Sequence, residues 1–308
     1  MSTAGQYHAG ELAAQASAGL AGPAQASRRA IRGEIPDRAA AFLAARPMLV
    51  VGAADAPGRM WATLLTGPPG FVRALDDRTV EVAARPAPGD PLAVALARPA
   101  RVGTLAIEPA TRRRMRLNGR AEPTGSGLRI AVDQVYGNCP KYIARRAPLP
   151  RPAAGPGATD PGVEVATELS VEDRRLVADA DTFFVATRSA DGDADASHRG
   201  GAPGFLRVLG PSRLRWPDYS GNAMLMTLGN LGQVAAAGLL VPDWGTGTAL
   251  HLTGTATVEW DPEAAAAEFP GAQRVVEFRL AEVVRAHGVL PTAWTVAEPS
   301  RFTPPAAR

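Results

Sequence analysis

The same corner sequence occurs twice in this chain, 134 residues apart. Gly67-Pro68-Pro69-Gly70-Phe71-Val72-Arg73 returns as Gly201-Ala202-Pro203-Gly204-Phe205-Leu206-Arg207. After a one-residue slip the similarity continues, with Gly103, Leu105, Leu117, Gly119 and Ala121 matched by Gly238, Leu240, Leu252, Gly254 and Ala256. Solenoid repeats have periods of about 20–50 residues, whereas this period is the size of a whole domain. The sequence therefore predicts two copies of one domain.

The composition is that of an ordinary globular protein with room for about two domains. The chain has 308 residues, 46% of them hydrophobic, and a net charge of +3 that comes almost wholly from arginine. A nucleic-acid partner would need basic residues clustered on one face with aromatic residues between them. The only clusters are Arg112-Arg113-Arg114 and Arg145-Arg146. We expect the first to be a solvated face at a strand turn, and we expect no nucleic-acid partner.

Cysteine and histidine usage narrows the chemistry further. Cys139 is the only cysteine, so no internal disulfide can form, and a reducing compartment such as the cytoplasm is expected. The four histidines are far apart with no paired spacing, so no metal site is predicted. The longest apolar runs fall short of the ~20 residues that span a bilayer, which predicts no membrane helix.

The order of predicted elements is the same in both halves. Helices are expected over 8–21 and 37–45, followed by short strands separated by Gly, Pro and Asp turns, a short helix from Asp90-Pro91 to Arg98, and further strands. The second half repeats this order, with a helix over 222–231. The predicted divisions are an N-terminal helical segment (1–36), a first barrel (37–146), a Pro/Gly-rich linker (147–165), a second barrel (166–298) and a tail (299–308).

Several motifs resemble one known family. They are Asp195-Ala196-Ser197-His198-Arg199-Gly200-Gly201, Pro217-Asp218-Tyr219-Ser220-Gly221-Asn222, Thr227-Leu228-Gly229-Asn230-Leu231 and Tyr136-Gly137-Asn138-Cys139-Pro140-Lys141-Tyr142. They resemble the pyridoxamine 5′-phosphate oxidase-like, FMN-binding split-barrel family in its duplicated form. The resemblance implies a mainly β, α+β fold: two tandem six-stranded antiparallel split barrels that form a pseudo-dimer within one chain. It also implies FMN held between the barrels, in a chain that works as a monomer or a homodimer.

The resemblance places the FMN phosphate on the second copy. A phosphate dianion is held by hydroxyl or backbone donors, a helix N-terminus and arginine. The candidates are Ser197, Arg199, Gly200, Tyr219, Ser220, Asn222, Thr227 and Asn230. The family's usual Ser-Arg-Lys run reads Asn222-Ala223-Met224 here, which leaves Arg199 as the favoured charge partner.

The first copy lacks these groups, so one FMN per chain is expected. It has leucine in place of the arginine, and the acidic Asp90 at its helix start. It contributes Asn138, Lys141 and Tyr142 instead, on a short helix expected after its last strand, with Lys141 near flavin N1. Strand alternation directs His198 to the face opposite Ser197 and Arg199.

The predicted activity is that of an FMN-dependent oxidoreductase. Electrons would pass from NAD(P)H, or from a reductase acting in trans, to oxygen or a small organic substrate, with the flavin supplying the reactivity. No catalytic residue is assigned; Lys141 and His198 are the candidates for proton transfer. Two alternatives stay open. In the first, Arg199 only neutralises Asp195 and Ser197 only fills a strand position. In the second, the chain binds flavin, deazaflavin or haem without catalysis.

Overall fold

The computed structural model describes residues 6–149, 162–290 and 293–305, and three short helices open it. They are α1 (Ala9–Ser17), α2 (Ala21–Arg28) and α3 (Asp37–Ala44). The single helix expected over 8–21 is in fact α1 alone, because the chain takes a left-handed turn at Gly19, where φ is 66°. His8 and Glu11 form a capping box at the start of α1, which satisfies backbone N–H groups that the first turn leaves free.

The first half folds into one antiparallel sheet. Its strands are β1 (Met48–Ala54), β2 (Met60–Thr66), β3 (Val72–Ala74), β4 (Thr79–Val82), β5 (Ala100–Glu108), β6 (Arg113–Pro123) and β7 (Leu128–Gly137). They lie in the order β2-β1-β5-β6-β7-β4-β3. The helix expected after Asp90 is reduced to a turn and the 3₁₀ helix η1 (Ala95–Ala97), and η2 (Pro109–Thr111) joins β5 to β6.

The second half folds into a sheet of corresponding order. Its strands are β10 (Thr182–Arg188), β11 (Ala194–Gly200), β12 (Arg207–Gly210), β13 (Arg213–Tyr219), β14 (Ala236–Pro242), β15 (Ala249–Glu259) and β16 (Ala272–Ala286). They lie in the order β11-β10-β14-β15-β16-β13-β12, and β9 (Val163–Ala166) adds to β16. Each path has seven strands, one more than the six expected, because the short hairpin strands β3 and β12 join the open edges.

The repeated corner has one structure in both halves. The amide of Gly70 donates to Ala44 O at 2.6 Å, and the amide of Gly204 donates to Ala178 O at 2.7 Å. These bonds tie each corner to the helix before it, α3 in the first half and α4 (Val171–Asp179) in the second. The repeat is therefore a scaffold feature that joins a helix to its sheet.

The two sheets pack against each other through reciprocal contacts. A Cβ added at Gly103 would lie 2.4 Å from Asp195 Cα, and one added at its counterpart Gly238 would lie 2.5 Å from Trp61 Cα. Asp195 and Trp61 are themselves counterparts in the repeat. Such reciprocity is the pattern of an interface with two-fold symmetry. An apolar cluster between the sheets takes Val50, Leu64 and Leu105 from one half and Phe184 and Leu240 from the other.

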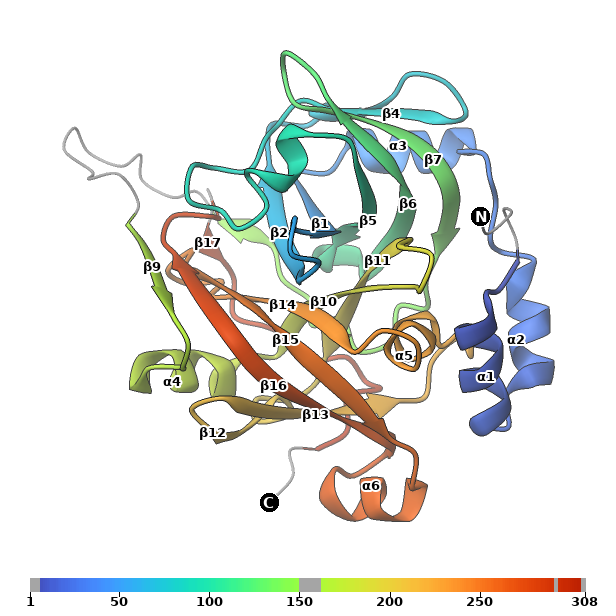
Figure 1. Ribbon diagram of the computed structural model, residues 1–308, viewed down its shortest axis with the longest axis vertical. Helices are drawn as coiled ribbons and strands as arrows, with labels where there is room; N and C mark the ends of the chain where they lie inside the picture. Colours follow the sequence, from blue (N-terminus) through green and yellow to red (C-terminus); the bar gives the residue numbers. More distant parts are fainter. Residues whose placement is uncertain (1–5, 150–161, 291–292, 306–308) are drawn as a thin grey trace.

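The remaining elements lie around this pair of sheets (Figure 1). Helix α1 contacts α5 (Met226–Leu231), which is four residues shorter at its start than the helix expected over 222–231. Helix α6 (Pro262–Glu268), which was not expected, begins at Asp261, whose carboxylate accepts from the amides of Glu263 and Ala264. β8 (Pro148–Leu149) pairs with β17 (Ala293–Trp294). Most of the predicted linker, 150–161, lies outside the described residues.

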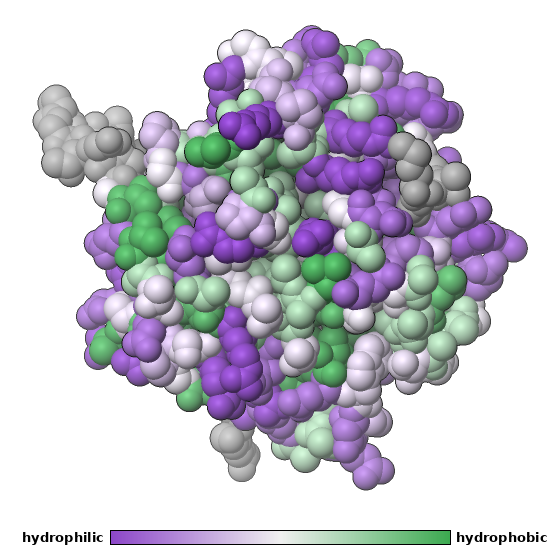
Figure 2. Space-filling view, viewed as in Figure 1, coloured by the Kyte–Doolittle hydropathy of each residue, from purple (hydrophilic) through white to green (hydrophobic). Residues whose placement is uncertain are grey.

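The outer surface is chemically mixed. Polar and apolar residues alternate over the face drawn in Figure 2, and apolar residues gather only in small groups there. Within the described segments, no helix has the length and apolar character needed to cross a membrane.

Candidate functional site

A small cleft lies where the end of β11 meets β6 of the other half. Its volume is about 90 Å³, enough for several water molecules. A second hollow of about 70 Å³ adjoins it and shares several lining residues, among them Arg116, Asn138, Arg199 and Asn222. Both halves of the chain therefore build the walls.

Many of the residues predicted for the cofactor line this cleft. Those present are Asn138, Lys141, Tyr142, Arg199, Gly200, Tyr219 and Asn222, together with His198. Ser220 lies at the edge, where its carbonyl accepts a hydrogen bond of 3.0 Å from the Tyr142 hydroxyl. The rings of Tyr142 and Tyr219 are 5.1 Å apart. Residues from both halves thus converge, and their contact with a cofactor stays a prediction.

The segment after β7 is not the short helix that the sequence suggested. Residues 138–142 form an irregular turn, and Tyr142 has a left-handed backbone with φ of 65°. This turn carries Asn138, Lys141 and Tyr142 to the second half. Lys141 Nζ also lies 5.3 Å from the centre of the Phe302 ring, so the C-terminal segment flanks its ammonium group.

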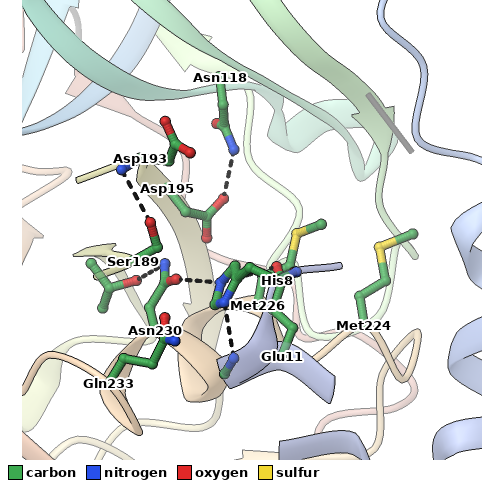
Figure 3. Close-up of polar contacts among 12 residues, drawn as sticks. His8, Glu11, Asn118, Ser189, Asp193, Asp195, Met224, Met226, Asn230 and Gln233 are labelled. Carbon is green, nitrogen blue, oxygen red and sulfur yellow. Dashed lines mark hydrogen bonds and ion pairs between the residues drawn. The ribbon is translucent and has the colours of Figure 1, made fainter. Parts of the chain in front are cut away.

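Three predicted residues are used inside the protein instead. Ser197 is fully buried, and its hydroxyl is 2.8 Å from the Thr227 hydroxyl and donates to Asp195 at 3.2 Å. Asn230 donates to the Thr187 hydroxyl at 3.0 Å. It also accepts from the His8 ring at 2.8 Å, as Figure 3 shows. Ser197 and Asn230 do not line the cleft, whereas Thr227 borders only the adjoining hollow. Their polar groups fasten α1 and α5 to β10 and β11.

His198 lies in the cleft beside Arg199, contrary to the expectation from strand alternation. Both residues lie at the end of β11, whose last residue is Gly200. The cleft therefore reaches both faces of the strand there. The His198 ring also packs edge-on against Phe184, with centroids 5.8 Å apart. The alternation rule holds within the strand and fails as a guide to the site at its end.

The cleft is strongly cationic. Arg114, Arg116, Lys141 and Arg199 line it, and among the described residues no Asp or Glu does so. The compensating carboxylates lie behind the wall: Arg116 contacts Asp195 at 2.8 Å. Arg199 contacts Asp218 at 2.9 Å, so the neutralisation of Asp195 considered above falls to Arg116. Arg274 also contacts Asp218, at 2.9 Å.

Arg114 has no carboxylate partner in the described chain. The ion pairs of that part do not include it, and its one side-chain contact is His198 Nδ1, 2.7 Å from its Nη1. Burial, together with the charges of Arg116 and Arg199, lowers its pKa to about 9. A guanidinium in this position favours an incoming anion, because the anion would supply the charge that the protein omits.

Several buried polar atoms around the cleft have no hydrogen-bond partner. They are Arg114 Nε, Arg116 Nε, Arg199 Nε, Asn138 Oδ1 and His198 Nε2. An unsatisfied buried donor or acceptor typically costs about 1–3 kcal/mol, so native proteins rarely leave them together without a reason. Four of these five atoms are donors, and a ligand with several acceptors, such as a phosphate group, would satisfy them.

The contact with Arg114 also fixes the protonation of His198. A guanidinium can only donate, so Nδ1 must accept, and the ring proton of the neutral form lies on Nε2. Burial and the charges of Arg114, Arg199 and Arg116 hold the His198 pKa well below its usual value. His198 is therefore a neutral N–H donor at neutral pH.

Sequence reasoning missed Arg114 and Arg116, although a signal was present. Arg114, Arg116 and Asn118 alternate with the buried Met115 and Leu117 on β6, so one face of that strand is polar. Arg113 does face solvent, as expected for the Arg112–Arg114 cluster. Arg114 does not, because the polar face of β6 meets the other half rather than water.

The corresponding place on the opposite side of the pair lacks these arginines. By the repeat, Ala249 and His251 stand where Arg114 and Arg116 do, and Leu64 and Leu65 stand where His198 and Arg199 do. Leu64 and Ala249 belong to the apolar cluster between the sheets.

Within the described residues, no group of three or more His, Cys, Asp or Glu side chains is placed to bind a metal.

Comparisons with known proteins give structural matches only. No protein-family model and no curated protein matches the chain. Among solved structures, a protein related to Bacillus subtilis general stress protein 26, of the pyridoxinephosphate oxidase family, from Clostridium acetobutylicum matches with 14% identity and a TM-score of 0.31, over 41% of this chain and 92% of its own.

Two further matches are of the same extent. An FMN-binding protein from Syntrophomonas wolfei matches with 9% identity and a TM-score of 0.30, over 37% of this chain and 84% of its own. A protein named F420 reductase matches with 18% identity and a TM-score of 0.24, over 39% of this chain and 93% of its own.

Proposed function

We propose that this chain is an FMN-dependent oxidoreductase built from two tandem split barrels, with one FMN in the cleft between them. The observation that carries the proposal is the cationic cleft itself: four cations line it, no carboxylate does, and five buried polar atoms around it have no partner. The FMN phosphate is a dianion near neutral pH, and arginine is well suited to bind it. The motif resemblance in the sequence supports FMN as the source of that phosphate.

The residues of the cleft would divide the work of binding. Arg114 and Arg199 supply charge to the phosphate, and His198 Nε2–H supplies a neutral donor. Lys141 supplies a further positive charge on the side of the first half, which would favour an anionic reduced flavin. When bound, FMN supplies the electron-transfer chemistry, and the protein orients it and sets the local charge.

The electron donor and the assembly state are part of the same proposal. Electrons come from NAD(P)H or a reductase in trans and pass to oxygen or a small organic acceptor. Since both walls of the cleft belong to one chain, a monomer holds a complete site.

The test is binding of FMN compared with riboflavin, which lacks the phosphate. FMN is expected to bind more tightly than riboflavin, and Arg114→Met and Arg199→Met are each expected to weaken FMN roughly 10- to 100-fold, as for a lost charged hydrogen bond. Isothermal titration would measure both. Arg129→Met, at an exposed position on β7, is the matched control and should bind FMN normally.

Equal affinity for FMN and riboflavin would contradict the phosphate assignment, and no affinity for either would end the proposal. Mass spectrometry of any ligand released from the denatured protein distinguishes FMN from a deazaflavin or haem. Anaerobic bleaching of the flavin absorbance by NADPH distinguishes an enzyme from a protein that only binds flavin.

A further inference from the structure

A second, larger groove adjoins the cleft on the outside of the first half. Its volume is about 480 Å³, and it runs between α3, the start of β6 and the end of β7. Five arginines line it: Arg32, Arg38, Arg112, Arg113 and Arg114. We call it the arginine groove. No Asp or Glu is among its lining residues.

Three of these arginines have no carboxylate partner. Arg112 and Arg113 are paired with Glu298 and Glu108, at 3.5 Å and 2.7 Å. Arg32, Arg38 and Arg114 appear in none of the ion pairs of the described chain, and Arg32 and Arg38 are exposed. The guanidinium groups of Arg32, Arg38 and Arg114 give the groove a positive potential, which attracts anions.

The floor of the groove is apolar. Phe42 and Ala39 of α3, Met115 of β6 and Val135 of β7 line it together with Pro140. The Arg113 guanidinium lies 5.3 Å from the centre of the Phe42 ring. An apolar floor beside free guanidinium groups suits a ligand that has both a flat ring system and anionic groups.

The groove and the cleft share two lining residues. Arg114 and Asn138 line both, and the Nε and Oδ1 atoms that they leave unpartnered are buried at the junction. A ligand with phosphates on Arg32 and Arg38 would therefore extend toward the cleft at its other end.

We propose that the arginine groove binds a phosphorylated nucleotide co-substrate, namely a nicotinamide dinucleotide. This inference rests on the proposed function, since the co-substrate is the electron donor of the flavin in the cleft. It favours a small dinucleotide over a reductase protein, because the free charges line a groove with an apolar floor rather than a flat surface.

The experiment is titration of the FMN-loaded protein with NADP⁺ and, separately, with NAD⁺, which bind without reducing the flavin. Arg32→Glu and Arg38→Glu are each expected to weaken dinucleotide binding at least tenfold. Both positions are exposed, so the variants should fold, and neither lines the cleft, so their FMN affinity should equal that of the original protein. Arg175→Glu, at an exposed position of α4, is the control for the change in net charge.

The outcomes separate the two proposals. A normal dinucleotide affinity in Arg32→Glu and Arg38→Glu, or an equal loss in Arg175→Glu, overturns the groove assignment. Binding of FMN without binding of either dinucleotide overturns it as well and leaves the flavin site standing. Tighter binding of NADP⁺ than of NAD⁺ would mean that the groove binds the extra phosphate of NADP⁺. Equal binding would mean that the groove binds the diphosphate that both dinucleotides share.

Discussion

Glu11 lies in an environment where a charged carboxylate is costly. Only 5% of the residue's surface is exposed, and Glu11 lines a polar pocket together with Asp195, His8 and Asn118 (Figure 3). Burial, with a smaller contribution from the Asp195 charge, raises the Glu11 pKa from 4.5 to about 8. The backbone amide of His8 donates to Glu11 at 2.9 Å, so Glu11 is held as the partner of His8 in the capping box of α1.

The raised pKa of Glu11 predicts that the stability of the protein depends on pH, and that Glu11→Gln removes this dependence. Between about pH 4.5 and pH 8 the folded protein keeps a proton on Glu11 that the unfolded chain has released, so stability falls as the pH rises through that range. Glu11→Gln keeps a hydrogen-bond acceptor for the cap and carries no charge. We expect it to raise the melting temperature at pH 8 by several degrees and to leave it unchanged at pH 4.5.

Differential scanning calorimetry over that pH range would measure the effect. Glu122→Gln, at an exposed position of β6, is the matched control and should keep the original pH dependence. Parallel pH profiles for Glu11→Gln and the original protein would contradict the assignment.

At the scale of elements, α4 depends on a cap that the sequence already indicated. Ser170 accepts from the Asp173 amide at 3.0 Å, and Asp173 accepts from the Ser170 amide at 2.9 Å. Arg285 of β16 donates to the Ser170 hydroxyl at 3.0 Å. The cap therefore fixes the start of the helix and also its position against the sheet.

Ser170→Ala is expected to lower the free energy of unfolding by about 1 kcal/mol, the usual value for a lost N-cap. Urea denaturation would measure it. Ser126→Ala, in an exposed turn of the first half, should change the stability little. If Ser170→Ala left the free energy of unfolding unchanged, Arg285 and Asp173 would hold the start of the helix without the Ser170 hydroxyl.

The elements also show which parts of the fold are local. The strands, their turns and the capped start of α4 followed from hydrophobic pattern and turn residues, which act over a few positions. The short helix expected after β7 was wrong because the backbone there follows contacts with the second half, where Tyr142 meets Ser220 and Tyr219. The cations Arg114 and Arg116 were missed for the same reason, because their role depends on what lies opposite β6.

At the scale of the whole molecule, two glycines set how closely the sheets approach. Gly103 and Gly238 lie against the backbone of Asp195 and Trp61 in the other half, closer than any side chain allows. Asp195 also accepts from Arg116 and from the Tyr136 hydroxyl, so the same contact positions one wall of the cleft.

Gly103→Ala is therefore expected to destabilise the protein by about 1–3 kcal/mol, as overpacking does, and to weaken any ligand of the cleft. Gly125→Ala, where an added Cβ meets nothing within 4 Å, is the control. Chemical denaturation and the FMN titration above would measure the two effects. A Gly103→Ala variant as stable as the original would mean that the sheets can separate slightly without loss.

The walls of the cleft come from two halves of one covalent chain, and this has a consequence for dilution. In an assembly of separate subunits, a site between them disappears when the protein concentration falls below the dissociation constant of the pair. Here the connecting segment sets the effective concentration of one half near the other. That effective concentration does not change with the amount of protein present. The ligand affinity of the cleft should thus be the same at nanomolar and micromolar protein.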